Sequence, residues 1–446
     1  MMHKPRIGLY AVYEPPEEGW GEMEAQLDQA QADLEAQGLE VRRAPEAVGS
    51  LAACERVAAW LSAEGLEALH ALVVTWSFDH YTVEIQQRTA LPVAVRSIPG
   101  IRSGSLVGGM QLNNLLHELG SEYRLFFGPL GDAGVAAETA HYLWACAIRR
   151  RLHGARLGVI GRRTEGMTPT AVDELEILRL FGVRLVNYGL DELLERAAQV
   201  DQDAARQAWQ AVAAGAAQVL STQESGVSSA RNLLALQELA REQGLSAISI
   251  GSYPRCQGTM CLPIALLNQQ GLPCGCEGDV NSTLAMLILS QLSDLPVHFG
   301  EMLEVDEAAN TLVTSHCGCG SPALADGNGY ILCPVRLAYS GVSVRFSARS
   351  GPVTYMNLVG RQGSYRMCAI EGQAAPTGMV FEGNPLKFVL QTPFRRTWRD
   401  VSEFGFGHHW MSAYARAVPV LKEFCQISGI LGVFPDLNLV VNREAR

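Results

Sequence analysis

Short apolar runs alternate with amphipathic helical patterns through the first two thirds of the chain. In the first stretch the apolar runs, each predicted to be a strand, are residues 7–12, 39–42, 71–76 and 91–95. The helical patterns between them are residues 20–37 and 51–64. Strands that are apolar on both faces are typical of a parallel sheet with helices on each side. The pattern therefore predicts a doubly wound α/β domain.

The same alternation begins again near residue 156, after a helix that ends in three arginines. The strands predicted for this second stretch are residues 156–161, 183–186, 217–220 and 247–250. The helices predicted between them are residues 171–181, 204–214 and 229–242. The chain therefore contains a second α/β domain of the same Rossmann-like kind, and the two are not close sequence repeats.

Beyond about residue 295 the pattern changes to short β-rich segments separated by Gly and Pro. These segments are residues 305–307, 310–314, 335–347, 353–360 and 387–392, followed by a helical pattern at 411–425. They predict a mainly antiparallel β domain. We expect domain boundaries that give 1–152, 153–295 and 296–446.

Composition excludes several classes of function. A formal charge of -11 disfavours nucleic acid or an anionic membrane as partner, because phosphate binding needs clustered positive charge. No apolar run approaches the roughly 20 residues of a membrane span. Residues 7–12 are too short for the core of a signal peptide. Eleven cysteines in such a chain favour reduced thiols, and we expect a cytoplasmic protein.

Potential metal ligands follow two of the apolar runs. Glu277 lies between a predicted strand and a helix at 282–292, and Glu301 follows a predicted strand at 296–299. Their spacing suits one helix plus one strand, which predicts both carboxylates at one sheet edge. A carboxylate before a helix also serves as a cap, so Glu277 has a structural alternative.

Histidines that could complete such a site occur further along the chain. His316 ends a predicted hairpin strand, where a purely structural role is common, and His408 and His409 share a Gly-loosened loop. Adjacent histidines point in different directions, so we expect one direct ligand from this pair. Carboxylate and imidazole ligands together suit Mn²⁺, or Mg²⁺ or Co²⁺. Such an ion polarises a carbonyl, and two nearby carboxylates can then move a proton.

Three short blocks resemble the L-fucose/L-arabinose isomerase superfamily. They are residues 276–289 (CEGDVNSTLAMLIL), 298–301 (HFGE) and 314–318 (TSHCG), and residues 407–409 (GHH) match the late histidine motif. Residues 158–167 (GVIGRRTEGM) are similar to the fucose isomerase branch. The chain is shorter than typical fucose isomerases, which leaves its substrate open.

The resemblance implies two α/β domains and a β-barrel-like C-terminal domain, assembled as trimers or hexamers with sites at subunit contacts. It implies a metal held by Glu277, Glu301 and His409, with His316 as an additional ligand. The two glutamates then act as the acid and base that move a proton between C1 and C2 through an enediol. Substrate-binding candidates, the first three matched to pocket positions of the family, are Trp76, Gln111, Met167, Arg255 and His408.

The function predicted from these features is a metal-dependent aldose–ketose isomerase acting on a small-molecule sugar. Arg162, Arg163 and Arg255 follow strands, where a guanidinium clamps an anionic group or forms a surface ion pair. An isomerase or epimerase of a sulfo- or phospho-sugar is therefore an alternative. A non-catalytic sugar-binding protein is another. Two Cys-x-Cys pairs, at 274–276 and 317–319, either hold a soft metal or pack as buried thiols.

Overall fold

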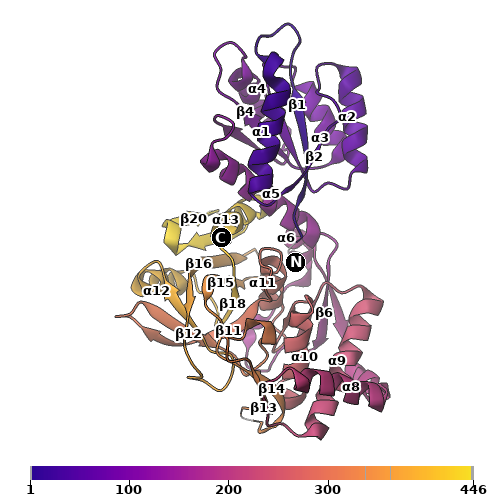
Figure 1. Ribbon diagram of the computed structural model, residues 1–446, viewed down its shortest axis with the longest axis vertical. Coiled ribbons are helices and arrows are strands. Elements are labelled where there is room, and N and C mark those ends of the chain that lie inside the picture. Colours follow the sequence, from indigo (N-terminus) through magenta and orange to yellow (C-terminus); the bar gives the residue numbers. More distant parts are fainter. Residues whose placement is uncertain (1–2, 337, 362, 443–446) are drawn as a thin grey trace. The chain divides into compact units, whose positions relative to one another are not determined.

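The computed structural model describes residues 3–336, 338–361 and 363–442. The chain forms two compact units, His3–Arg151 and Leu152–Arg446, whose elements are labelled in Figure 1. No helix among the described residues combines the length and the apolar character that a bilayer span needs. The predicted division into three domains, with a boundary near residue 295, remains a prediction.

The first unit is built on a parallel sheet with strand order β2-β1-β3-β4-β5. The strands are β1 (Arg6–Val12), β2 (Glu40–Arg43), β3 (Ala68–Val73), β4 (Val93–Ser97) and β5 (Tyr123–Phe127). The helices are η1 (Trp20–Glu22), α1 (Met23–Ala36), α2 (Leu51–Ala63), α3 (His80–Thr89), α4 (Ser105–Glu118) and α5 (Ala133–Leu152). All six residues of β3 are buried, as expected for a central strand covered on both faces.

The second unit begins with another parallel sheet, of order β10-β9-β6-β7. Its strands are β6 (Arg156–Gly161), β7 (Arg184–Tyr188), β9 (Ala247–Gly251) and β10 (Cys274–Gly275). The helices of this part are η2 (Thr168–Thr170), α6 (Glu174–Phe181), α7 (Leu190–Gln199), α8 (Gln202–Ala214), α9 (Gln223–Gln243), α10 (Gln257–Gln269) and α11 (Val280–Leu289). The two predicted parallel sheets are therefore confirmed.

The C-terminal part is a closed barrel of six antiparallel strands. The strands follow the order β15-β18-β11-β12-β17-β16, and β15 pairs with β16 to close the sheet. They are β11 (His298–Asp306), β12 (Thr311–Ser315), β15 (Gly351–Val359), β16 (Arg366–Ala375), β17 (Leu386–Leu390) and β18 (His409–Ala413). Closure leaves these strands without free edges. The predicted antiparallel β region is confirmed.

Further elements surround the barrel. They are η3 (Pro322–Leu324), β13 (Ile331–Val335), β14 (Ser340–Arg345), α12 (Phe394–Glu403), α13 (Val418–Ser428), β19 (Leu431–Phe434), η4 (Pro435–Leu437) and β20 (Leu439–Val441). β19 and β20 extend the sheet beyond β16. The prediction that residues 217–220 form a strand of the parallel sheet is wrong. Only β8 (Gln218–Val219) forms there, exposed on both residues, and it pairs with β13.

Helix α11 joins the parallel sheet to the barrel. All ten of its residues are buried, and it contacts β9 and β10 of the sheet and β15 and β18 of the barrel. Its N-terminus is thereby fixed between the two sheets, and the residues just before it face both of them.

Two boundaries differ from the prediction near the proposed site. β11 runs without interruption from His298 to Asp306, so Glu301 lies inside a barrel strand and not at the edge of the parallel sheet. The helix predicted at 411–425 begins only at Val418, because Trp410 and Met411 are buried in strand β18. The apolar residues at the start of this range fit a strand that faces the barrel core as well as they fit one face of a helix.

Candidate metal and sugar site

The loop between β10 and α11 holds Glu277 in an unusual backbone conformation. Glu277 has φ 62° and Gly278 has φ 70°, a left-handed pair that side chains seldom adopt. A Cβ at Gly278 would lie 2.7 Å from Cα of Arg163, so the close approach of that loop requires glycine. Strain of this kind is concentrated at functional sites.

The cap of α11 is Asp279, not Glu277. One carboxylate oxygen of Asp279 accepts from the backbone N–H of Ser282 at 3.0 Å, and the other accepts from the Ser282 hydroxyl at 2.7 Å. The capping alternative for Glu277 therefore does not apply. Glu277 is 8% exposed, and its side chain faces two histidines.

His409 lies between the two carboxylates of this loop. Its Nδ1 is 2.8 Å from Oδ2 of Asp279, and its Nε2 is 3.2 Å from Oε2 of Glu277. A carboxylate only accepts, so Nδ1–H donates to Asp279; Nε2 faces Glu277 and carries a proton in the cationic ring and a lone pair in the neutral ring. Both Nε2 and the facing Oε2 are buried without a hydrogen-bond partner among the described residues.

Glu301 and His316 border this pair. Glu301 in β11 is the register partner of His409 in β18, so the two side chains leave the sheet on the same face. Nε2 of His316, just after β12, lies 3.8 Å from Oε1 of Glu277. The ring of Phe299 packs on both imidazoles, with centroids at 5.0 Å from His316 and 4.7 Å from His409.

The surroundings move the pKa values of the two glutamates apart. Burial acts to raise the pKa of Glu277, but His409 and His316 outweigh it, and that pKa is lowered. Burial raises the pKa of Glu301; His409 opposes this shift and the charge of Glu277 adds to it. Burial also lowers the pKa of His316 to about 4, which leaves a neutral imidazole. Groups with opposed shifts are typical of acid and base pairs.

His409 titrates differently from His316. Burial acts to lower its pKa, but the hydrogen bond to Asp279 and the neighbouring Glu277 carboxylate outweigh burial and raise the pKa to about 10. Asp279 is buried; burial acts to raise its pKa, and the hydrogen bond to His409 reverses this effect and lowers the pKa.

The donor set fits a divalent cation. Ligand atoms of Glu277, His408 and His409 lie within 4.8 Å of one another. Oε2 of Glu277 and Nε2 of His409 have no hydrogen-bond partner within the described part of the chain, and the Asp279 carboxylate accepts from the other ring nitrogen of His409. A carboxylate in that position is the usual means of orienting a histidine toward a metal. His408 lies in the loop just before β18, and the expectation that only one of the adjacent histidines is a direct ligand remains a prediction.

The remaining predicted residues lie in three places. In the first unit, Nε1 of Trp76 donates to Oε1 of Gln111 at 3.0 Å, and Nε2 of Gln111 donates to Asp79 at 2.9 Å. Asp79 was not predicted. In the second unit, Met167 is half-buried at the start of η2, and Arg255 is exposed and paired with Asp191 at 2.6 Å.

Two other arginines lie beside the cluster. The backbone of Arg162 and Arg163 packs on Gly278, and the backbone N–H of Thr164 donates to the carbonyl of Glu277 at 3.2 Å. Both side chains are exposed. A small cavity lined by Asp279, His408 and His409 also borders Pro169, Val359 and Gly407, which line a wider pocket as well.

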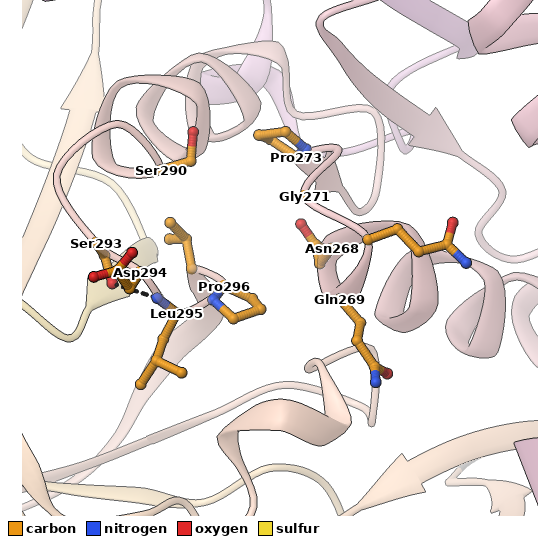
Figure 2. A pocket seen from close by; sticks show the side chains of 11 residues that line it. Asn268, Gln269, Gly271, Pro273, Ser290, Ser293, Asp294, Leu295 and Pro296 are labelled. Atoms are coloured by element: carbon orange, nitrogen blue, oxygen red, sulfur yellow. Dashed lines mark hydrogen bonds between the residues drawn. The ribbon is translucent and has the colours of Figure 1, made fainter. Parts of the chain in front are cut away.

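A separate pocket of about 280 Å³ lies at the far ends of α10 and α11 (Figure 2). Asn268, Ser290 and Asp294 are among its lining residues, and Figure 2 shows the hydroxyl of Ser293 bonded to the backbone N–H of Leu295. Its lining contains one carboxylate and neither histidine nor cysteine. The chemistry described above therefore belongs to the Glu277 cluster.

Comparisons with known proteins give relatives of one kind. No family model matches the sequence. The chain is 25% identical over 368 residues to the sulfoquinovose isomerase of Alkalicoccus urumqiensis, covering 78% of this chain and 82% of that protein. It is 26% identical over 363 residues to the sulfoquinovose isomerase of Clostridium sp. (strain MSTE9), covering 76% and 80%. It is 22% identical over 367 residues to that of Priestia aryabhattai, covering 78% and 81%.

Proposed function

We propose that this protein is a metal-dependent isomerase that converts an open-chain sulfo-sugar between its aldose and ketose forms. Similarity to the sulfoquinovose isomerases indicates an aldose–ketose isomerase, which is an intramolecular oxidoreductase. The observation that carries the metal site is the buried, unpartnered pair of Glu277 Oε2 and His409 Nε2, 3.2 Å apart. Membership in the fucose/arabinose isomerase superfamily is part of the proposal.

The metal would be held by Glu277, Glu301 and His409, with His316 and His408 as further donors. Mixed carboxylate and imidazole donors favour an ion of the Mn²⁺ class, with Mg²⁺ or Co²⁺ as substitutes. Such an ion, when bound, polarises the sugar carbonyl and acidifies the neighbouring hydroxyl. The Asp279 carboxylate fixes the tautomer of His409, so that Nε2 is the nitrogen directed to the metal.

Proton transfer is the task we assign to the glutamates. Burial raises the pKa of Glu301, which brings this carboxylate closer to the pKa that suits an exchangeable proton at neutral pH. Glu301 would accept the proton from C2, which leaves an enediolate; the hydroxyl proton of O2 then passes to O1, and Glu301 would return its proton to C1. Glu277, with its lowered pKa, stays charged and holds the metal. Two carboxylates with separate tasks favour an enzyme over the sugar-binding alternative.

The sulfo-sugar alternative is better supported than a fucose- or arabinose-type substrate. The relatives carry the name of a sulfo-sugar isomerase. A sulfonate stays charged at every physiological pH, and a forked guanidinium binds it well. Arg162 and Arg163 are exposed beside Glu277, whereas Arg255 is paired with Asp191. We therefore assign the sulfonate to the first two arginines.

The remaining part of the proposal concerns assembly. We propose a trimer or hexamer in which Trp76 and Gln111 of a neighbouring chain line the sugar pocket. Met167 and His408, which belong to the chain that holds the metal, line the same pocket. The hydrogen bonds from Trp76 to Gln111 and from Gln111 to Asp79 hold the indole in one orientation. A fixed aromatic face is suited to packing on the apolar side of a sugar chain.

A substrate panel tests the proposal. After EDTA treatment and Mn²⁺ add-back, the protein is assayed for ketose formation from sulfoquinovose, glucose 6-phosphate, L-fucose and L-arabinose. We expect metal-dependent turnover, fastest with sulfoquinovose, and exchange of its C2 proton with solvent deuterium. Binding without turnover or exchange for every sugar would support the sugar-binding alternative. Equal turnover of sulfoquinovose by an Arg162→Ala/Arg163→Ala variant would reject the arginine assignment.

A further inference from the structure

A buried group of thiols lies directly behind His316, on the side away from Glu277. Sγ of Cys319 is 3.4 Å from Nδ1 of His316, and Sγ of Cys276 lies within 4.8 Å of Sγ of Cys319. Ligand atoms of Cys276, His316 and Cys319 all lie within 4.8 Å of one another, and all three residues are buried. The cluster therefore contains two sulfurs and one imidazole nitrogen at chelating distances.

The turn between His316 and Cys319 fixes this geometry. The spacing His316-x-x-Cys319 matches the short spacing with which two ligands of one metal are usually supplied. Gly318 between them has φ 102°, and a Cβ there would lie 2.5 Å from Cβ of Ser343. Each predicted Cys-x-Cys pair contributes only one thiol to the cluster, so the pairs do not act as units.

We propose that Cys276, Cys319 and Nδ1 of His316 form a second metal site, for a thiophilic divalent cation such as Zn²⁺ or Cd²⁺. Sulfur and imidazole donors select such ions over Mn²⁺ or Mg²⁺. Binding releases one proton from each thiol, and the two thiolates balance the charge of the cation. The buried thiol of Cys261 interacts electrostatically with both cysteines, but it lies outside the group of ligand atoms that are within 4.8 Å of one another.

Occupancy of this site removes His316 from the proposed catalytic metal. A neutral imidazole has one lone pair, so coordination through Nδ1 places the ring hydrogen on Nε2. That nitrogen is the one 3.8 Å from Glu277. A thiophilic cation therefore weakens binding of the catalytic cation. This consequence rests on the proposed function, whereas binding of the thiophilic ion itself does not.

Cadmium titration of the Mn²⁺-loaded full chain tests the site directly, through the ultraviolet charge-transfer absorption of a Cd²⁺–thiolate bond. We expect saturation at one Cd²⁺ per chain. Cys276→Ser and Cys319→Ser, made separately, each weaken Cd²⁺ binding at least about tenfold, by analogy with the effect of lost supporting contacts at metal sites. Cys256→Ser, which changes a half-exposed thiol outside the cluster, leaves the titration unchanged.

The absence of a charge-transfer band in the wild type would overturn the proposal. So would a band of undiminished affinity in both serine variants. Serine is close to cysteine in size, and far-ultraviolet circular dichroism of each variant checks its folding. If one variant misfolds, the other decides the outcome.

Mn²⁺ affinity tests the shared histidine. The dissociation constant of Mn²⁺, measured from the electron paramagnetic resonance of the free ion, is compared with and without one equivalent of Cd²⁺. We expect an increase of at least about tenfold in the wild type and a much smaller one in Cys319→Ser, where Cd²⁺ acts only by direct competition. An unchanged constant in the wild type would reject the sharing of His316. Failure of Mn²⁺ to bind under any condition would reject the proposed function instead, and the Cd²⁺ band would still report on the thiol site.

Discussion

Glu277 and Glu301 lie near the same histidine, yet their surroundings move their pKa values in opposite directions. We expect Glu301→Gln to bind the metal more weakly and, at saturating Mn²⁺, to lower kcat by about 10²- to 10⁴-fold, the usual contribution of a general acid or base. Glu277→Gln should lose the metal as well as activity, because it removes the charged donor beside His409. Metal content and C2 deuterium exchange measure the two effects separately. Full activity in either variant would contradict these roles.

Asp279 acts on the site only through His409. Asp279→Asn keeps a good helix cap but replaces the carboxylate that accepts from Nδ1. We expect Mn²⁺ affinity to fall by about 10- to 100-fold, with little change in stability. Ser282→Ala is the matched control, since it removes a hydrogen bond to the same carboxylate oxygen and leaves His409 paired. Equal Mn²⁺ affinity in Asp279→Asn and the wild type would show that Asp279 has only a capping role.

The candidate ligands were proposed from the sequence, but the residues that hold them in place were not. Glu277, Glu301 and His409 were singled out by position, and the structure brings them together. The contact between Asp279 and His409 joins residues 130 positions apart, and no local pattern encodes it. His408 was predicted to bind substrate, and the structure places one of its ligand atoms within 4.8 Å of those of Glu277 and His409.

At the scale of elements, helix α11 is the connection on which the site depends. Leu284 is fully buried between the parallel sheet and the barrel. Leu284→Ala should lower the free energy of unfolding by about 2–5 kcal/mol through lost burial and the cavity that remains. Leu175 in α6 is 78% exposed, and Leu175→Ala should change it by less than about 0.5 kcal/mol. Urea titrations monitored by circular dichroism compare the two, and equal effects would contradict the packing role of α11.

Elements were predictable where burial left a clear pattern in the sequence. β9 is buried along its whole length and was predicted from its apolar run, whereas β3, also buried throughout, begins three residues before the predicted 71–76. β8 and β18 were misassigned for opposite reasons. Two exposed residues form β8 only by pairing with distant β13, and the apolar residues of β18 resemble a helical face until the barrel closes. Pairing between distant segments decided both cases.

For the whole molecule, the two compact units should respond differently to metal. The proposed ligands all belong to the unit Leu152–Arg446. Mn²⁺ at about 100 times its dissociation constant should stabilise that unit by about 2.7 kcal/mol, because it binds the folded state alone. Hydrogen exchange of the intact chain, with Mn²⁺ and after EDTA, should show added protection in α11 and β18 and none in β3. Equal protection of β3 would contradict a site confined to the second unit.

Assembly can be tested by mixing two inactive variants. Trp76→Ala alters the first unit and Glu277→Gln alters the proposed metal site in the second. If a neighbour's first unit completes each site, a mixed oligomer contains some sites with an intact Trp76 from one chain and an intact Glu277 from the other. Unfolding and refolding the variants together should then restore part of the sulfoquinovose isomerase activity that neither has alone. Differently tagged chains that purify together would show that mixed oligomers form. If these oligomers stay inactive, either both residues of each site come from one chain or Trp76 is not part of the site.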